Sequence, residues 1–205
     1  MRIERIEKSK HKQERVLVFL EGGDLLRITG AELLRFGLYK GMDLSPALVV
    51  ELQAAAQQSQ LKQTAARMAS GRMLSKKEVQ HRLTKKGATE EQAADTADWL
   101  ETLGAVDDEG YAGVIVRHYG AMGYGPGRVK QELHRRGVPR ELWDEALEEL
   151  PEPAEQIRRF LEGKLRGRTP DEKEKKRLCD ALLRRGFSWS DVGPALRELG
   201  AETEE

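Results

Sequence analysis

Two adjacent carboxylates, Asp107 and Asp108, stand in the stretch "GAVDDEGYA", directly before an apolar run. Neighbouring acids can hold a metal ion or share a proton, and they can also start a helix. A calcium loop needs more oxygen ligands and a distal glutamate, and no Asp-x-Asp-x-Asp loop is present. Tyr111, Ile115 and Tyr119 then follow at helical spacing. We therefore favour Asp107 as the cap of this helix and Asp108 as an acid in its first turn.

Other kinds of site chemistry find little support in the sequence. The chain has one cysteine, Cys179, so an internal disulfide is impossible and the usual four-ligand zinc site is not expected. No Ser/His/Asp or Cys/His set stands out, although such triads assemble in space rather than in sequence. We expect no catalytic residue, no metal and no cofactor, and a protein that is not an enzyme.

Three adjacent basic pairs are the main candidates for binding a partner. The pairs are Lys85–Lys86, Arg135–Arg136 and Arg184–Arg185. Basic residues suit the negative end of a helix dipole, and this bland interpretation explains them as well as a partner does. Their recurrence at a fixed period favours a shared binding surface, so both interpretations stay open. The full candidate set is Arg72, Lys85, Lys86, Arg117, Arg128, Arg135, Arg136, Arg184 and Arg185.

The elements that position these pairs form an internal repeat. A glycine follows each pair, and Gly87, Gly137 and Gly186 are spaced by 50 and 49 residues. Alignment on these glycines puts Leu83, Leu133 and Leu182 in one apolar column, and Val79, Val129 and Leu178 in another. The two columns are four residues apart and share one helix face. Each glycine fits a helix C-cap, which needs a left-handed backbone.

Start signals divide each repeat into three helices. Ser75 with Glu78, Thr89 with Gln92, and Thr169 with Glu172 read as N-caps. A further helix precedes each pair of capped helices, and the expected ranges of these first helices are 54–71, 108–121 and 154–166. A unit of this size buries little apolar area, so neighbouring repeats must stack.

The first thirty residues differ from the rest. The stretch "ERVLVFLEGGDLLRITG" reads as a β-hairpin that turns at Glu-Gly-Gly-Asp. Thr29 and Glu32 fit a capping box that opens a short helix, and Ser45 with Pro46 fits the start of another.

We therefore predict a mainly α fold of three tandem three-helix repeats, elongated and curved, with a small N-terminal β-hairpin and helix. The predicted domains are an N-terminal segment over 1–45 and repeats over 46–106, 107–152 and 153–205, the last ending in an acidic tail.

Composition bounds the function. Lysine plus arginine equals aspartate plus glutamate, 35 against 35, so net charge gives no argument for nucleic acid. No apolar segment approaches the ~20 residues that span a bilayer, and the N-terminus "MRIERIEKSK" has no signal-peptide character. We expect a cytoplasmic protein without a membrane partner.

Three stretches together resemble the RecX family of recombination regulators. They are "SGRMLSKKEVQHRLTKKG", "LGAVDDEGYA" and "GPGRVKQELHRRGV". The matching positions are Arg72, Ser75, Glu78, Leu83, Lys86 and Gly87, and then the acidic-aromatic signature Asp107, Asp108, Tyr111 and Ala112. The resemblance covers roughly residues 54–200, and the third repeat is the most divergent.

The resemblance implies a function. RecX-like proteins are arrays of three-helix repeats that lodge in the groove of the RecA–DNA filament and inhibit ATP hydrolysis and strand exchange. It thus implies the RecA filament as partner, a monomeric regulator, and a place in recombination, DNA repair and the SOS response. The alternative is a direct nucleic-acid binder, because three-helix units are similar to helix-turn-helix modules and basic pairs can contact single- or double-stranded DNA.

Overall fold

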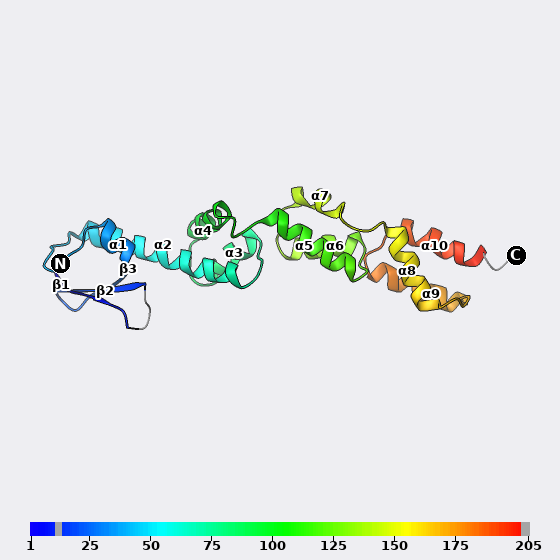
Figure 1. Ribbon diagram of the computed structural model, residues 1–205, viewed down its shortest axis with the longest axis horizontal. Coiled ribbons are helices and arrows are strands. Elements are labelled where there is room, and N and C mark those ends of the chain that lie inside the picture. Colours follow the sequence, from blue (N-terminus) through cyan, green and yellow to red (C-terminus); the bar gives the residue numbers. More distant parts are fainter. Residues whose placement is uncertain (11–13, 202–205) are drawn as a thin grey trace. The chain divides into compact units, whose positions relative to one another are not determined.

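A computed structural model of the chain describes residues 1–10 and 14–201. A small N-terminal sheet is followed by helices, which confirms the predicted mainly α fold class (Figure 1). The chain forms two compact units, Met1–Gly71 with Gln80–Leu100, and Arg72–Val79 with Glu101–Glu205. They are called the first unit and the second unit below. The four predicted domain ranges stay a prediction, and residues 202–205 of the predicted acidic tail lie outside the described residues.

The sheet of the first unit is antiparallel and contains the predicted hairpin. Strand β2 pairs with β3 and the chain turns between them at Gly22 and Gly23, whose φ angles are 100° and 91°. A third strand, β1, pairs with the other edge of β2 and was not expected, because its charged and apolar residues alternate only loosely. The strands are β1 Ile3–Lys8, β2 Arg15–Leu20 and β3 Leu25–Thr29, in the order β1-β2-β3.

Helix α1, Gly30–Arg35, begins with the predicted capping box of Thr29 and Glu32, which is confirmed. Glu32 is buried and also accepts a hydrogen bond from the hydroxyl of Ser59 on the next helix, α2 (Pro46–Gly71). One carboxylate therefore caps α1 and fixes it against α2.

Helix α2, Pro46–Gly71, is one continuous helix of 26 residues. It begins at the predicted Ser45–Pro46 signal, where the Ser45 hydroxyl accepts the N–H of Leu48 at 3.2 Å. The first helix of the first repeat is therefore longer than the expected range of 54–71. Its residues Val49 and Leu52 pack in one core with the apolar face of the sheet.

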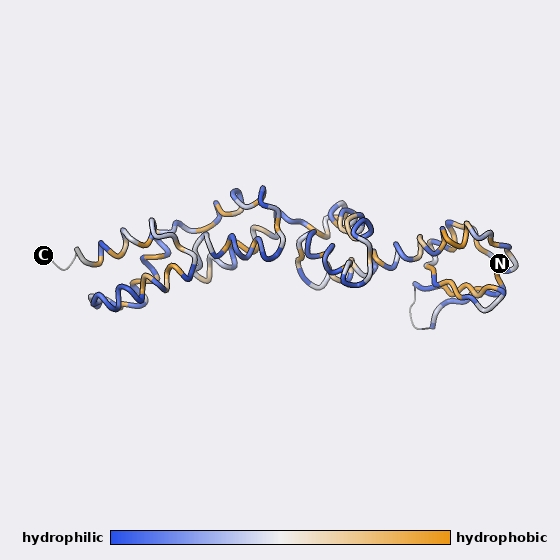
Figure 2. Tube along the Cα trace, turned by 180° about the vertical axis from the view of Figure 1, so that it is seen from behind, coloured by the Kyte–Doolittle hydropathy of each residue, from blue (hydrophilic) through white to orange (hydrophobic). Residues whose placement is uncertain are grey.

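The described residues after α1 contain nine α-helices in three groups of three, which confirms the predicted repeats. Hydrophilic and apolar stretches alternate along these helices, as expected when one face is buried (Figure 2). A 3₁₀ turn, η1 Arg140–Leu142, precedes the short α7. The groups are α2, α3 Lys76–Thr84 and α4 Glu90–Thr102; α5 Asp108–Ala121, α6 Pro126–Arg135 and α7 Trp143–Leu147; and α8 Pro153–Leu165, α9 Glu172–Arg184 and α10 Trp189–Ala201.

The second and third repeats each have a core built from the predicted apolar columns. Val129 and Leu133 are fully buried with residues of α5 and α7. Leu178 and Leu182 are buried with residues of α8 and α10. The column spacing therefore identified the buried face of α6 and of α9.

The three repeat glycines end their helices as predicted. Their φ angles are 92° at Gly87, 70° at Gly137 and 88° at Gly186. An L side chain would be strained at each of these positions, so the sequence register of the glycines follows from the backbone.

The predicted helix starts are confirmed in the first repeat and wrong in the third. Ser75 exchanges capping hydrogen bonds with Glu78, and Thr89 with Gln92. In the third repeat the N-cap is Asp171 rather than Thr169, because the Asp171 carboxylate accepts the Glu174 N–H at 2.6 Å. Relative to its glycine, α9 starts one turn earlier than α3 or α6.

Asp107 is the N-cap of α5, as predicted. Its carboxylate accepts the N–H of Gly110 at 3.0 Å, and the residue itself is exposed. An N-cap acceptor satisfies one of the N–H groups that the first helical turn leaves unpaired.

We expect Asp107→Ala to lower the free energy of unfolding by about 0.5–2 kcal/mol, because the Gly110 N–H loses its acceptor. Urea unfolding measures this change, and Asp107→Ser is the matched control because serine also caps well. Divalent metal is expected to leave the melting temperature unchanged in all three proteins. A metal-dependent rise in the wild type that Asp107→Ala abolishes would contradict the capping interpretation.

Candidate partner-binding surface

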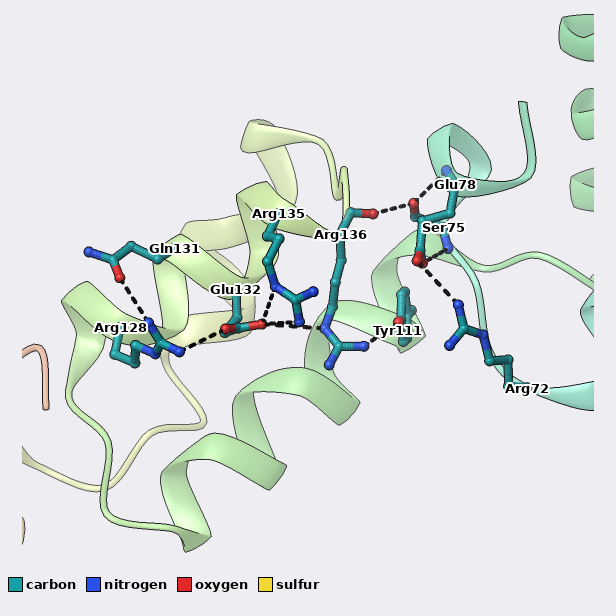
Figure 3. A network of polar contacts seen from close by, with 9 residues as sticks. All are labelled: Arg72, Ser75, Glu78, Tyr111, Arg128, Gln131, Glu132, Arg135 and Arg136. Carbon is teal, nitrogen blue, oxygen red and sulfur yellow. Dashed lines mark hydrogen bonds and ion pairs between the residues drawn. The ribbon is translucent and has the colours of Figure 1, made fainter. Parts of the chain in front are cut away.

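The best-defined polar cluster of the second unit is centred on Glu132 in α6 (Figure 3). Glu132 is 3% exposed and faces three arginines, at 3.2 Å from Arg128, 2.7 Å from Arg135 and 3.8 Å from Arg136. Three of the predicted partner-binding residues therefore surround one buried carboxylate. This group of four residues is called the Glu132 cluster.

The arginines hold Glu132 in its charged form. Burial by itself would raise the pKa of Glu132, but hydrogen bonds from Arg135 and Tyr119 and the charges of Arg135 and Arg128 outweigh burial and lower the pKa. A buried carboxylate needs such partners, because an unpaired charge in the interior is costly.

Arg136 is the more deeply placed member of its pair. Its side chain is 28% exposed, against 64% for Arg135. The Arg136 guanidinium donates a hydrogen bond of 2.7 Å to the hydroxyl of Tyr111 on α5 and lies 5.9 Å from that ring. Its Nε is buried, makes no hydrogen bond within the described residues, and lies 3.8 Å from the Glu132 carboxylate. Arg136 therefore links α6 to α5 within the second repeat.

The backbone of Arg136 joins two repeats. The Ser75 hydroxyl, at the start of α3, donates a hydrogen bond of 2.5 Å to the Arg136 carbonyl. The next residue, Gly137, lies so close to Lys77 that an added Cβ would meet the lysine side chain at 2.9 Å. The start of α3, the second helix of the first repeat, thus contacts the loop that follows α6, the second helix of the second repeat.

The same joint occurs one repeat later. Gly125 and Gly127, at the start of α6, donate backbone hydrogen bonds of 2.9 Å to the carbonyls of Arg185 and Gly186. Gly186 is so close to Arg128 that an added Cβ would clash with the Arg128 backbone. These two places are called the first and second repeat joints.

The side chain of Arg185 repeats the position of Arg136. It lies 5.0 Å from the ring of Phe160 on α8, as Arg136 lies over Tyr111 on α5. It also donates to the carbonyls of Met122 and Gly123, at 3.1 and 3.0 Å. The second arginine of each of the two arginine pairs therefore makes contacts within the protein.

Asp108 also acts beyond its own helix. It is buried, and its carboxylate accepts the backbone N–H of Lys76, at the start of α3, at 2.9 Å. Burial raises the pKa of Asp108, the Lys76 hydrogen bond lowers it, and the charge of Glu101 raises it further, so that the pKa lies above its ordinary value. The two adjacent acids thus start two different helices.

The remaining candidates lie at separate places. Arg72 pairs with Glu78 at 3.6 Å and Arg117 pairs with Glu149 at 2.6 Å. Lys85, Lys86 and Arg184 are exposed, and none of them forms an ion pair within the described part of the chain. The structure therefore gathers Arg128, Arg135 and Arg136, and gives the others individual environments.

The remaining residues of the predicted structural motif have clear positions. Ala112 is fully buried on α5 beside Tyr111, in the core of the second repeat. Glu132 was not among the predicted residues, although its spacing of four residues from both Arg128 and Arg136 is a usable signal.

Residues 1–10 and 14–201 contain no group of three or more His, Cys, Asp or Glu side chains that could hold a metal ion. Among the same residues, no helix is both long enough and apolar enough to cross a bilayer.

Comparisons with known proteins extend the sequence resemblance. Two family models match this chain, "RecX, second three-helix domain" over residues 107–147 and "RecX, third three-helix domain" over residues 152–196. The chain is 32% identical to the Regulatory protein RecX of Geobacillus kaustophilus over 197 residues, which cover 93% of this chain and 73% of that protein. It is 28% identical to the Regulatory protein RecX of Bacillus licheniformis, with 99% and 79% covered.

Solved structures share the fold, two crystal structures among them. A crystal structure of regulatory protein RecX superposes with a TM-score of 0.75 at 24% identity, and the match covers 96% of this chain and 98% of that one. A crystal structure of RecX from Lactobacillus salivarius gives a TM-score of 0.61 at 23% identity, covering 70% and 97%. At these identities the likeness speaks for the fold alone.

We expect Glu132→Gln to lower the free energy of unfolding by about 1–3 kcal/mol at pH 7, because three arginines lose a buried counter-charge. The folded pKa of Glu132 is lowered. Its contribution is therefore present above the unfolded pKa and is lost as pH falls through the folded pKa. Urea unfolding of both proteins between neutral and acidic pH measures the difference. A difference that does not shrink in acid would contradict the ion-pair account.

We expect the opposite pH dependence at Asp108. Its folded pKa is raised, so its contribution is complete below the unfolded pKa and is lost as pH rises through the folded pKa. The stability of the wild type relative to Asp108→Asn should therefore fall as pH rises from acid to neutral, since the asparagine does not titrate. A relative stability that rises over the same range would show that the buried carboxylate prefers its charged form.

Proposed function

Because the chain belongs to the RecX family of regulatory proteins, we propose that it regulates the recombinase RecA by binding the RecA–DNA filament. The observation that carries this proposal is the RecX likeness over 93% of the chain at 32% identity. The proposed site is the helical groove of the filament, and the proposed effect is inhibition of ATP hydrolysis and strand exchange. We further propose a monomer that acts in the cytoplasm, in recombination and DNA repair.

The repeats support this proposal in physical terms. Tandem helical repeats offer extended surfaces, and a groove in a polymer offers an extended site. Many weak charged contacts, each worth about 0–1 kcal/mol at a surface, add up when several subunits are touched at once.

Among the candidate residues, those that are exposed and form no internal ion pair are the most accessible to a partner. Lys85, Lys86 and Arg184 are exposed and have no ion pair within the described residues, so a partner's acids or phosphates can reach them without breaking an internal contact. Arg136 and Arg185 hold elements of the second unit together, and changes there alter the fold as well as the surface. We therefore propose Lys85, Lys86 and Arg184 as the first contacts to test.

The test is RecA-dependent ATP hydrolysis on single-stranded DNA. We expect wild-type protein to inhibit it, and Lys85→Glu/Arg184→Glu to need about tenfold more protein for the same inhibition, because each reversal turns an attraction into a repulsion. Far-UV circular dichroism should show an unchanged fold, since both side chains are exposed.

The matched control is Lys176→Glu/Arg177→Glu, two exposed basic residues of α9 outside the candidate set, with the same change in net charge. We expect it to inhibit as the wild type does. Equal loss in both variants would mean that net charge rather than a defined surface matters. Wild-type protein that leaves RecA unaffected would refute the proposed function. Binding to naked DNA as tight as binding to filaments would favour the direct nucleic-acid binder.

A further inference from the structure

In the first repeat, no helix start among the described residues packs against the loop that ends the second helix. In each of the two repeat joints, the glycine that ends the second helix of one repeat lies against the start of the second helix of the repeat before it. Gly137 lies against Lys77 in this way, and Gly186 lies against Arg128. The equivalent residue of the first repeat is Gly87, and an added Cβ there would meet nothing within 4 Å. The loop whose carbonyls accept hydrogen bonds from a preceding helix start in the other two repeats is therefore open in this one.

This open loop lines a groove within the first unit. Lys86, Gly87 and Ala88 form one wall of a groove of about 640 Å³. The other walls are β3, from Leu25 to Ile28, and the face of α2 between Leu52 and Thr64. A strand edge and a carbonyl-bearing loop therefore border the same space.

The edge of β3 that borders the groove carries unpaired main-chain groups. Within the described residues β3 pairs with β2 alone. The Leu20 N–H bonds to the Asp24 carbonyl, and the ladder then alternates, so Leu26 and Ile28 are the β3 residues that bond to β2. The N–H and C=O groups of Leu25 and Arg27 consequently point away from β2. An edge of this kind is a template for one more strand.

The charged side chains that line the groove are all positive. Its lining contains two basic residues, Arg27 and Lys86, and no acid. The polar side chains that α2 contributes are Gln53, Gln57, Gln60 and Thr64, which can donate and accept hydrogen bonds but carry no charge.

We propose that this groove binds an extended, acidic segment of a partner protein, which adds a strand to the edge of β3. Main-chain hydrogen bonds to Leu25 and Arg27 hold one side of the segment, and the carbonyls of Lys86 and Gly87 accept from its other side, as the equivalent carbonyls do in the second repeat joint. Acidic side chains of the segment pair with Arg27 and Lys86. The proposal goes beyond RecA regulation and does not depend on it.

The test uses the full chain, labelled with ¹⁵N, and a short peptide in which glutamate and valine alternate. We expect the peptide to shift the amide signals of Leu25, Arg27 and Gly87 and to slow hydrogen exchange at Leu25 and Arg27. A peptide with lysine in place of glutamate should bind at least about tenfold more weakly. Shifts elsewhere on the chain, or equal binding of both peptides, would overturn the proposal.

Two variants of Arg27 separate main-chain pairing from charge. Arg27→Gln keeps the outward N–H and loses the cation, and we expect binding to weaken about threefold. Arg27→Pro also loses that N–H, and proline is tolerated at an edge position whose N–H faces away from the ladder, so we expect a further loss of about fivefold. Equal binding of the two variants would rule out strand addition. If Arg27→Pro does not fold, hydrogen exchange in the wild type decides the same point.

A pair of double variants on α2 tests the location. Gln57→Glu/Gln60→Glu adds two acids to the groove wall, and we expect it to weaken binding of the glutamate peptide at least about tenfold. Ala54→Glu/Ala66→Glu adds the same charge at exposed positions of α2 outside the groove and should bind as the wild type does. Equal loss in both would overturn the proposed site. A concentration-dependent dimer that Gln57→Glu/Gln60→Glu abolishes would make a second copy of the chain the occupant, against the proposal.

Discussion

The second unit depends on backbone carbonyls that one helix end presents to the start of another. A helix leaves its last carbonyls and its first N–H groups unpaired. In the second repeat joint these two kinds of group bond to each other, and in the first repeat joint a serine hydroxyl takes the place of the N–H groups. The Arg136 carbonyl accepts from Ser75, and the Arg185 and Gly186 carbonyls accept from Gly125 and Gly127. Glycine is required at these loops because the backbone turns left-handed and the neighbouring chain comes close. The close approach adds a second reason for glycine at Gly137 and Gly186, whereas at Gly87 the left-handed backbone is the reason.

The members of the basic pairs have two different roles, because some make contacts within their own repeat and others stay exposed to solvent. Arg136 and Arg185, each the second residue of its pair, lie against an aromatic ring of their own repeat. The equivalent of these rings in the first repeat is Leu61, which offers no such face, and the equivalent lysine, Lys86, stays exposed. The recurrence of the pairs therefore has a structural cause in the second and third repeats. In the first repeat that cause is absent, and both lysines are available to solvent.

Local signals in the sequence predicted local structure well. The Asp107 cap, the capping boxes at Ser75 and Thr89, the hairpin turn and the glycine C-caps all depend on residues within one turn of each other. Contacts between distant residues could not be predicted in this way. The reach of Asp108 to Lys76 and of Ser75 to Arg136 spans 32 and 61 residues, and no spacing rule connects them. Strand β1 was missed because its pairing with β2, and not its own composition, makes it a strand.

The early start of α9 has a consequence for how such a chain can grow by gene duplication. In α3 and α6 the residue twelve positions before the repeat glycine lies at the start of the helix and donates a hydrogen bond to the loop of the following repeat. In α9 that position is Glu174, already inside the helix behind its own cap at Asp171. An additional repeat inserted between the second and third would find a joint on both sides. One appended after α10 would meet a helix turn at this position in place of the docking point that α3 and α6 offer.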